Sequence, residues 1–150
     1  MANQFIPYGR QHITQTDIDA VVAVLQSDFL TQGSQVPAFE ERVAAYTGAK
    51  FGVAVNSATS ALHIACLALG LGQGEKGKDD WLWTTPITFT ASANCGLYCG
   101  ANIDFVDIDP LTLNMSINAL EEKLQLADAE NRLPKIVIPV HFTGEPCDMA

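Results

Sequence analysis

The stretch FGVAVNSATSALHIACLAL, residues 51–69, contains the junction that decides the fold. Its first five residues, Phe51–Val55, form an apolar run that is typical of a buried strand. Its last part, Ala58–Leu69, is almost wholly apolar and long enough for a helix. A strand that enters a helix through a short turn of small and polar residues is the repeating unit of a parallel sheet covered by helices. The junction therefore predicts an α/β fold.

The same alternation continues to the end of the chain. Further strands are predicted at Trp81–Thr85, Ile103–Asp107 and Ile136–Val140, and further helices at Thr90–Cys99 and Ile117–Leu126. The last strand is followed by a loop, at the point where a parallel sheet requires a crossover helix. We therefore expect residue 150 to be a truncation point and not a natural terminus.

A helical arm precedes the sheet. Apolar residues at helical spacing predict a helix over residues 16–27, with Thr16 as its N-cap. A second helix is predicted to follow Pro37 and to stop at Gly48. The sequence thus predicts an arm over residues 1–50 that belongs to one domain over residues 1–150.

The composition excludes several classes of protein. Of the 150 residues, 48% are hydrophobic and 17% are charged, which is typical of a compact fold and not of a disordered chain. The net charge of −9 and the scattered basic residues argue against binding to nucleic acid or to an anionic membrane. No apolar run reaches the roughly 18 to 20 residues of a membrane helix, and residues 1–15 lack the apolar centre of a signal peptide. We therefore expect a cytoplasmic protein.

The turn between the first strand and its helix has the donors of a phosphate site. In α/β folds, ligands bind beyond the carboxyl ends of the strands, where a helix N-terminus offers unpaired N–H groups and the positive end of its dipole. Ser57, Thr59 and Ser60 add hydroxyl groups, and the small Ala58 leaves the approach open. N-capping by Ser57 or Thr59 explains the same residues without a ligand. The glycine motifs of NAD and ATP sites are absent here, which favours another phosphorylated ligand.

Two further residues follow predicted strands. Phe89 projects from a loop marked by proline, where it can stack on a flat ring or belong to the core. His141 follows the last strand, where it can line a pocket or simply cap the strand. The residues alone leave both alternatives open.

Two clusters could hold a metal ion. Asp104, Asp107 and Asp109 crowd the end of a strand, but solvated carboxylates at an Asp-Pro turn are the favoured interpretation. Cys95 and Cys99 lie one helical turn apart, yet their CxxxC spacing fits structural zinc patterns poorly. Without a secretion signal, reduced thiols are expected. The sequence therefore predicts no metal site.

Four segments occur in an order and spacing that characterise a known family. They are NSATSALHIA (56–65), TTPITFTASAN (84–94), VDIDPLTLNMS (106–116) and IPVHFTGEPCDM (138–149). With these segments the chain resembles the sugar-nucleotide aminotransferases of the DegT/DnrJ/EryC1/StrS family, which have the type I fold of pyridoxal-phosphate enzymes. Residues 6–62 resemble most closely the branch that aminates UDP-4-keto-6-deoxy-N-acetyl-β-L-altrosamine on the way to pseudaminic acid. The resemblance covers the whole chain apart from residues 72–80.

The resemblance implies a site for pyridoxal 5′-phosphate (PLP). It assigns Ala58, Thr59 and Ser60 to the phosphate of the cofactor, with Ala58 also touching the substrate. It places Phe89 against the pyridine ring. This chain would then form the N-terminal part of the large domain, with its mostly parallel sheet flanked by helices.

The resemblance also implies a nucleotide-sugar site that two subunits of a homodimer share. The residues expected to contact the sugar are Tyr8, Asp28, Phe29, Leu30 and Thr31. His141 and Asp148 match family positions without an individual role.

The implied reaction is transamination of a UDP-linked 4-keto-6-deoxy-N-acetylhexosamine, with glutamate as the amino donor. Family members supply the Schiff-base lysine and the acid that pairs with the pyridinium nitrogen from the region after VHFTGEPCDM (140–149), and no lysine of this chain falls at a matching position. We therefore expect the catalytic lysine beyond residue 150 and an inactive fragment.

Three alternatives remain at this stage. The intact protein could be a sister aminotransferase that acts at C3, or a PLP-dependent sugar dehydratase. The chain could instead be a non-catalytic remnant that serves as a binding or dimerisation module. An NAD-binding domain is disfavoured, because the first strand–turn–helix unit lacks the glycine fingerprint.

Overall fold

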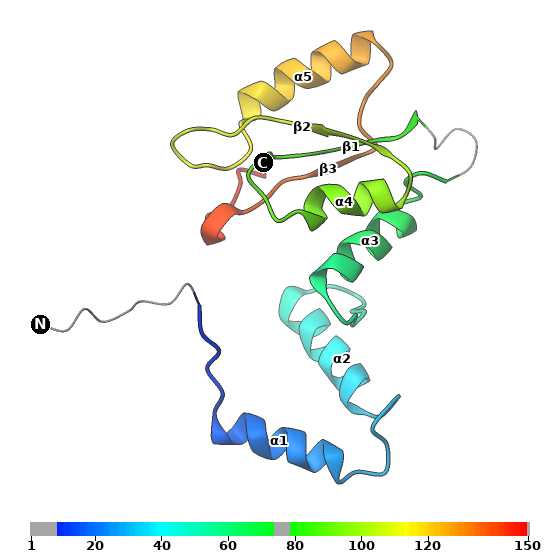
Figure 1. Cartoon of the computed structure of the whole chain (residues 1–150), viewed down its shortest axis with the longest axis vertical. Helices are drawn as coiled ribbons and strands as arrows, with labels where there is room; N and C mark the ends of the chain where they lie inside the picture. Colours follow the sequence, from blue (N-terminus) through cyan, green and yellow to red (C-terminus); the bar gives the residue numbers. More distant parts are fainter. Residues whose placement is uncertain (1–8, 74–78, 150) are drawn as a thin grey trace, which may run out of the picture. The chain divides into compact units, whose positions relative to one another are not determined.

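The computed structural model describes residues 9–73 and 79–149, which belong to two compact units divided between Ala54 and Val55. The first unit carries helices α1 and α2, and the second carries the sheet with helices α3, α4 and α5 (Figure 1). Tyr8, which the family resemblance assigns to the substrate, lies outside the described residues.

Helix α1 (Gln15–Leu25) begins with a capping box. The Thr14 hydroxyl accepts a hydrogen bond from the N–H of Asp17, and the Asp17 carboxylate accepts the N–H of Thr14 at 2.7 Å. The predicted N-cap at Thr16 is therefore wrong by two residues. Thr14 takes the position because an acidic residue three places further on can return its hydrogen bond.

Helix α2 (Gln35–Thr47) ends as the sequence predicts. Gly48 follows it with a φ of 73°, the left-handed conformation that glycine adopts without steric cost. The predicted stop at Gly48 is confirmed.

The predicted strand at Phe51–Val55 is wrong. No described strand pairs with this segment, and the N–H of Ala54 donates instead to the carboxylate of Glu40 at 2.8 Å. Phe51 and Val53 are 76% and 78% exposed. An apolar run indicates a tendency to be buried, but a strand also requires a hydrogen-bonded neighbour, which this segment lacks among the described residues.

In the described part of the second unit, three parallel strands form a sheet in the order β2-β1-β3 (Figure 1). The strands are β1 (Trp81–Thr84), β2 (Asn102–Phe105) and β3 (Ile136–Ile138). Leu82 of β1 pairs with Ile103 on one side and with Ile136 on the other. The prediction of a mostly parallel sheet with helical connections is confirmed.

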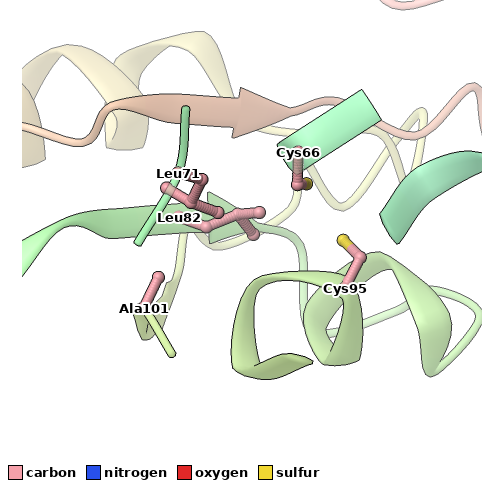
Figure 2. Packing of buried hydrophobic residues seen from close by; sticks show 5 residues of the cluster. All are labelled: Cys66, Leu71, Leu82, Cys95 and Ala101. Carbon is pink, nitrogen blue, oxygen red and sulfur yellow. The ribbon is translucent and has the colours of Figure 1, made fainter. Parts of the chain in front are cut away.

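Helices cover both faces of the sheet. Helices α3 (Ala58–Ala68) and α4 (Ala91–Tyr98) lie on one face, and α5 (Ile117–Ala129) lies on the other (Figure 1). Successive residues of β1 point to opposite faces, so Leu82 packs with Cys66 and Cys95 of the first pair of helices (Figure 2). No helix among the described residues is long and apolar enough to cross a membrane.

Lys135, just before β3, anchors the connection between α3 and β1. Its ammonium group donates to the carbonyl of Gly70 at 2.6 Å and to the carboxylate of Asp80 at 3.0 Å. The same carboxylate accepts the N–H of Gly72 at 2.9 Å. Gly72 has a φ of 70°, and a Cβ there would lie 1.7 Å from the carbonyl oxygen of Cys99, so this position requires glycine.

Candidate functional site

The turn before α3 is closed by hydrogen bonds among its own side chains. Ser57 is the N-cap, because its backbone is extended and its hydroxyl oxygen accepts the N–H of Ser60 at 3.1 Å. The Ser57 hydroxyl donates to the Ser60 oxygen at 3.0 Å. The Ser60 hydroxyl donates in turn to the Asn56 carbonyl oxygen at 2.8 Å. Of the two capping residues that the sequence leaves open, the structure selects Ser57.

Ala58 and Thr59 hold the free donors of this turn. The N–H groups of both residues and the hydroxyl of Thr59 have no hydrogen-bond partner among the residues that the structure describes. The first turn of α3 contains no acidic residue. Free N–H groups, a hydroxyl group and the positive end of the helix dipole together suit an anion such as phosphate.

The loop that carries Phe89 lies at the same edge of the sheet. Helices α3 and α4 pack against each other (Figure 1). Each of them ends near the start of the strand that follows it, so each begins near the carboxyl ends of the strands. Phe89 precedes Thr90, the N-cap of α4, and is 67% exposed. Within this chain Phe89 is therefore not part of the core, and its ring is accessible.

Hydroxyl groups fix the loop that presents Phe89. The buried Thr85 donates from its hydroxyl to the carbonyl of Ile87 at 3.2 Å. The Thr88 hydroxyl donates to the hydroxyl of Ser92, in the first turn of α4, at 2.9 Å. The threonines of this segment therefore shape the loop through local bonds.

A third loop follows β3. The ring nitrogen Nδ1 of His141 accepts the N–H of Cys147 at 3.0 Å, which assigns the proton of the neutral ring to Nε2. The buried Asn114 accepts the N–H of Phe142 at 2.9 Å and donates to the carbonyl of Glu145 at 3.0 Å. Sequence reasoning missed Asn114, since neither of its partners is near it in the chain.

The acidic cluster at the end of β2 is held by local contacts. Asp104 pairs with Lys123 at 2.7 Å, whereas Asp107 and Asp109 accept N–H groups of their own loop. Burial is the largest single influence on Asp104 and opposes its ionisation. The hydrogen bonds from Lys123 and from the N–H of Phe105, with the charges of Lys123 and Arg132, together outweigh burial and hold the pKa of this carboxyl below its usual value. These contacts favour the turn interpretation. Among the described residues, no three His, Cys, Asp or Glu side chains are placed to share a metal ion.

The cysteines carry free thiols, as predicted. Cys66 of α3 and Cys95 of α4 face each other in the core (Figure 2). Burial, and then the hydrogen bond with Cys95, raise the pKa of Cys66 to about 12. The Cys66 thiol is therefore neutral near pH 7, which suits a packing role.

The first unit contains the segment that the resemblance assigns to the nucleotide sugar. Asp28 and Phe29 line a pocket of about 410 Å³ between α1 and α2, together with Ser27 and Ser34. Leu30 and Thr31 are exposed and do not line this pocket. The structure thus brings two residues of the segment together at one cavity.

The sequence profile of the DegT/DnrJ/EryC1/StrS aminotransferase family matches residues 11–150. The chain belongs to this family. It is 40% identical over 147 residues to the spore coat polysaccharide biosynthesis protein SpsC of Bacillus subtilis, an alignment that covers 98% of this chain and 35% of that protein. It is 46% identical over 103 residues to the UDP-4-amino-4,6-dideoxy-N-acetyl-beta-L-altrosamine transaminase of Campylobacter jejuni, which covers 69% of this chain and 26% of that protein.

Solved structures of aminotransferases have the same fold over this region. Helicobacter pylori PseC, an aminotransferase of pseudoaminic acid biosynthesis, superposes with a TM-score of 0.81 at 30% identity, covering 95% of this chain and 36% of that chain. The sugar-aminotransferase homologue Spr1654 of Streptococcus pneumoniae, in its PLP form, superposes with a TM-score of 0.80 at 32% identity, covering 95% and 34%. The chain spans 35% of the length of the first curated relatives that it matches.

Proposed function

We propose that this chain is the N-terminal part of the large domain of a PLP-dependent nucleotide-sugar aminotransferase. The observation that carries the proposal is the set of donors on Ala58 and Thr59, at the start of α3, that have no hydrogen-bond partner within residues 9–73 and 79–149. It is supported by membership of an aminotransferase family and by a neighbour of the same fold that has a PLP form.

The residues at this edge of the sheet fit the cofactor. The N–H groups of Ala58 and Thr59 and the Thr59 hydroxyl would bind its phosphate, and the exposed ring of Phe89 would lie against the pyridine. Bound PLP supplies an electron sink for the transfer of an amino group. The chain contributes binding, the orientation of the ring and the exclusion of water from one of its faces.

For the substrate, we propose UDP-4-keto-6-deoxy-N-acetyl-β-L-altrosamine, aminated at C4 with glutamate as donor. Support comes from the 46% and 40% identity to two transaminases whose names contain the 4-amino-altrosamine product. The sugar nucleotide would contact Tyr8, Asp28, Phe29, Leu30 and Thr31. The intact protein would be a cytoplasmic homodimer with shared sites, and the lysine that moves the proton would come from outside this chain.

The cofactor site is tested by Thr59→Ala in the intact gene product. Loss of a hydroxyl donor to a doubly charged phosphate should weaken the affinity for PLP about tenfold or more, as measured by equilibrium dialysis. Thr16→Ala, an exposed threonine of α1, should leave the affinity unchanged. An unchanged affinity in Thr59→Ala would place the phosphate elsewhere.

The reaction is tested with the 4-keto sugar nucleotide and 15N-labelled glutamate. We expect the label at C4 of the product, detected by NMR, and no turnover by residues 1–150 alone. Labelling at C3 of a 3-keto substrate, with no activity on the 4-keto sugar, would contradict the proposed substrate.

A further inference from the structure

We propose that Asn56 is a positioning residue for the phosphate-binding turn, and that Ser60 supports this turn instead of donating to the phosphate. The inference rests on the proposed cofactor site at the start of α3. In this proposal Ala58 and Thr59 bind the phosphate directly, whereas Ser60 stabilises the turn that presents them.

Both donors of Ser60 are already in use. Its N–H donates to the Ser57 oxygen at 3.1 Å, and its hydroxyl donates to the Asn56 carbonyl oxygen at 2.8 Å. A serine hydroxyl has one hydrogen, so Ser60 has none left for an anion. The neighbouring donors of Thr59, by contrast, have no partner among the described residues.

Asn56 adds a second side-chain contact to the turn that Ser57 caps. Its carbonyl oxygen binds the hydroxyl of Ser60, four residues further on, while that hydroxyl oxygen accepts the hydrogen of Ser57. This chain of bonds fixes the backbone that aims the N–H groups of Ala58 and Thr59. A turn that is already ordered loses less entropy when the phosphate binds.

The bond also has an electrostatic consequence. A carbonyl oxygen beside an anion site is unfavourable when its lone pairs face the anion. In this turn the oxygen of Asn56 is occupied by the hydroxyl hydrogen of Ser60. Removing the Ser60 hydroxyl would leave that carbonyl oxygen without a donor beside the phosphate. Substitutions of Asn56 and of Ser60 should therefore both change the affinity for the phosphate group.

The test is a double-mutant cycle in the intact gene product, with dissociation constants for PLP and for pyridoxal, which lacks the phosphate. Asn56→Ala and Ser60→Ala should each weaken PLP binding about two- to fivefold, since each removes the same supporting hydrogen bond. The double variant should lose no more affinity for PLP than either single variant. Pyridoxal binding should not change in any of them, which also shows that the variants are folded.

Two further variants test the role of the Asn56 side chain, one conservative and one a control. Asn56→Asp keeps the acceptor for Ser60 but places a negative charge beside the phosphate, so PLP binding should weaken more than in Asn56→Ala and should recover in part at high salt. Asn118→Ala, an exposed asparagine in the first turn of α5, should match the wild type.

Several outcomes would overturn the inference. A tenfold loss in Ser60→Ala with no loss in Asn56→Ala would make Ser60 a direct ligand. Additive losses, or no loss in either variant, would remove the coupling through their hydrogen bond. If the wild type bound PLP and pyridoxal equally well, the cofactor site itself would be wrong and the role of Asn56 would fall with it.

Discussion

Asn114 binds Phe142 across 28 positions of the chain, with its carbonyl oxygen 2.9 Å from the Phe142 nitrogen. Its amide group also donates to the carbonyl of Glu145. Between these two contacts, Thr143 has a φ of 55°, in the left-handed region that β-branched residues rarely adopt. One buried side chain thus holds a strained turn at the end of β3.

Asn114→Ala should lower the free energy of unfolding by about 1–3 kcal/mol, because it removes the two hydrogen bonds that a buried side chain makes to the backbone of Phe142 and Glu145. Urea denaturation of the intact protein measures this difference. Asn118→Ala, which removes an exposed asparagine nearby, provides the comparison. Equal stability of the two variants would show that the strained turn does not depend on Asn114.

The ion pair of Lys123 with Asp104 should make stability sensitive to acid. Because the pKa of Asp104 lies below its usual value, its contribution is present above pH ~4 and is lost as the pH falls through the lowered pKa. Lys123→Met should cost less than about 1 kcal/mol at pH 7, since both side chains are partly exposed.

The measurement for this ion pair is the free energy of unfolding at pH 7 and at pH ~3. Between pH 7 and pH ~3, the free energy of unfolding should fall less in Lys123→Met than in the wild type. In Gln125→Met, a control on the same helix, it should fall as much as in the wild type. Parallel pH profiles for all three proteins would contradict the role of the ion pair.

The thiols of Cys66 and Cys95 should resist alkylation in the folded protein. Both are buried, and burial raises the pKa of Cys66 to about 12, so its thiolate is scarce near pH 8. Mass spectrometry after a pulse of iodoacetamide should find both unmodified, and modified in urea. Rapid labelling of Cys66 without denaturant would show that α3 and α4 separate.

The same pKa shift has a consequence in alkali. A thiol whose pKa is raised by folding stabilises the folded state below the ordinary thiol pKa of ~8.5 and loses this contribution as the pH rises toward 12. Between pH ~8 and pH ~10, the free energy of unfolding should therefore fall more for the wild type than for Cys66→Ala.

Phe89→Ala should weaken PLP binding and shift the absorption band of the bound cofactor, because one face of the ring loses its cover. Phe89→Tyr should keep both properties near those of the wild type, and Leu111→Ala, which removes another exposed apolar side chain, should do the same. An unaltered spectrum in Phe89→Ala would remove Phe89 from the cofactor site.

Local patterns predict most of the second unit. Helix α3 begins at Ala58 as expected, and the parallel strands appear within two residues of their predicted starts, because burial on both faces gives continuous apolar runs. The stop at Gly48 follows from a conformation that glycine favours. These features depend on residues that are close together in the sequence.

Features that depend on distant partners were not predictable. The segment at Phe51–Val55 has the composition of a strand, but pairing depends on a neighbour that composition does not reveal. The role of Asn114 depends on carbonyl and N–H groups about 30 positions away. The bond from Ser60 to Asn56 lies within the quoted stretch, yet a sequence of hydroxyl residues does not say which of them are already satisfied.

The anchor formed by Lys135 and Asp80 bears on how this protein can change during evolution. These side chains hold Gly70 and Gly72 directly to the residues beside β1 and β3. Because the cost of closing a loop grows slowly with its length, we expect the start of β1 to tolerate a change in the number of residues between Gln73 and Asp79. We therefore expect related proteins to differ in length at this place. A fluorescent reporter inserted between Gln73 and Asp79 would leave the register of β1 unchanged.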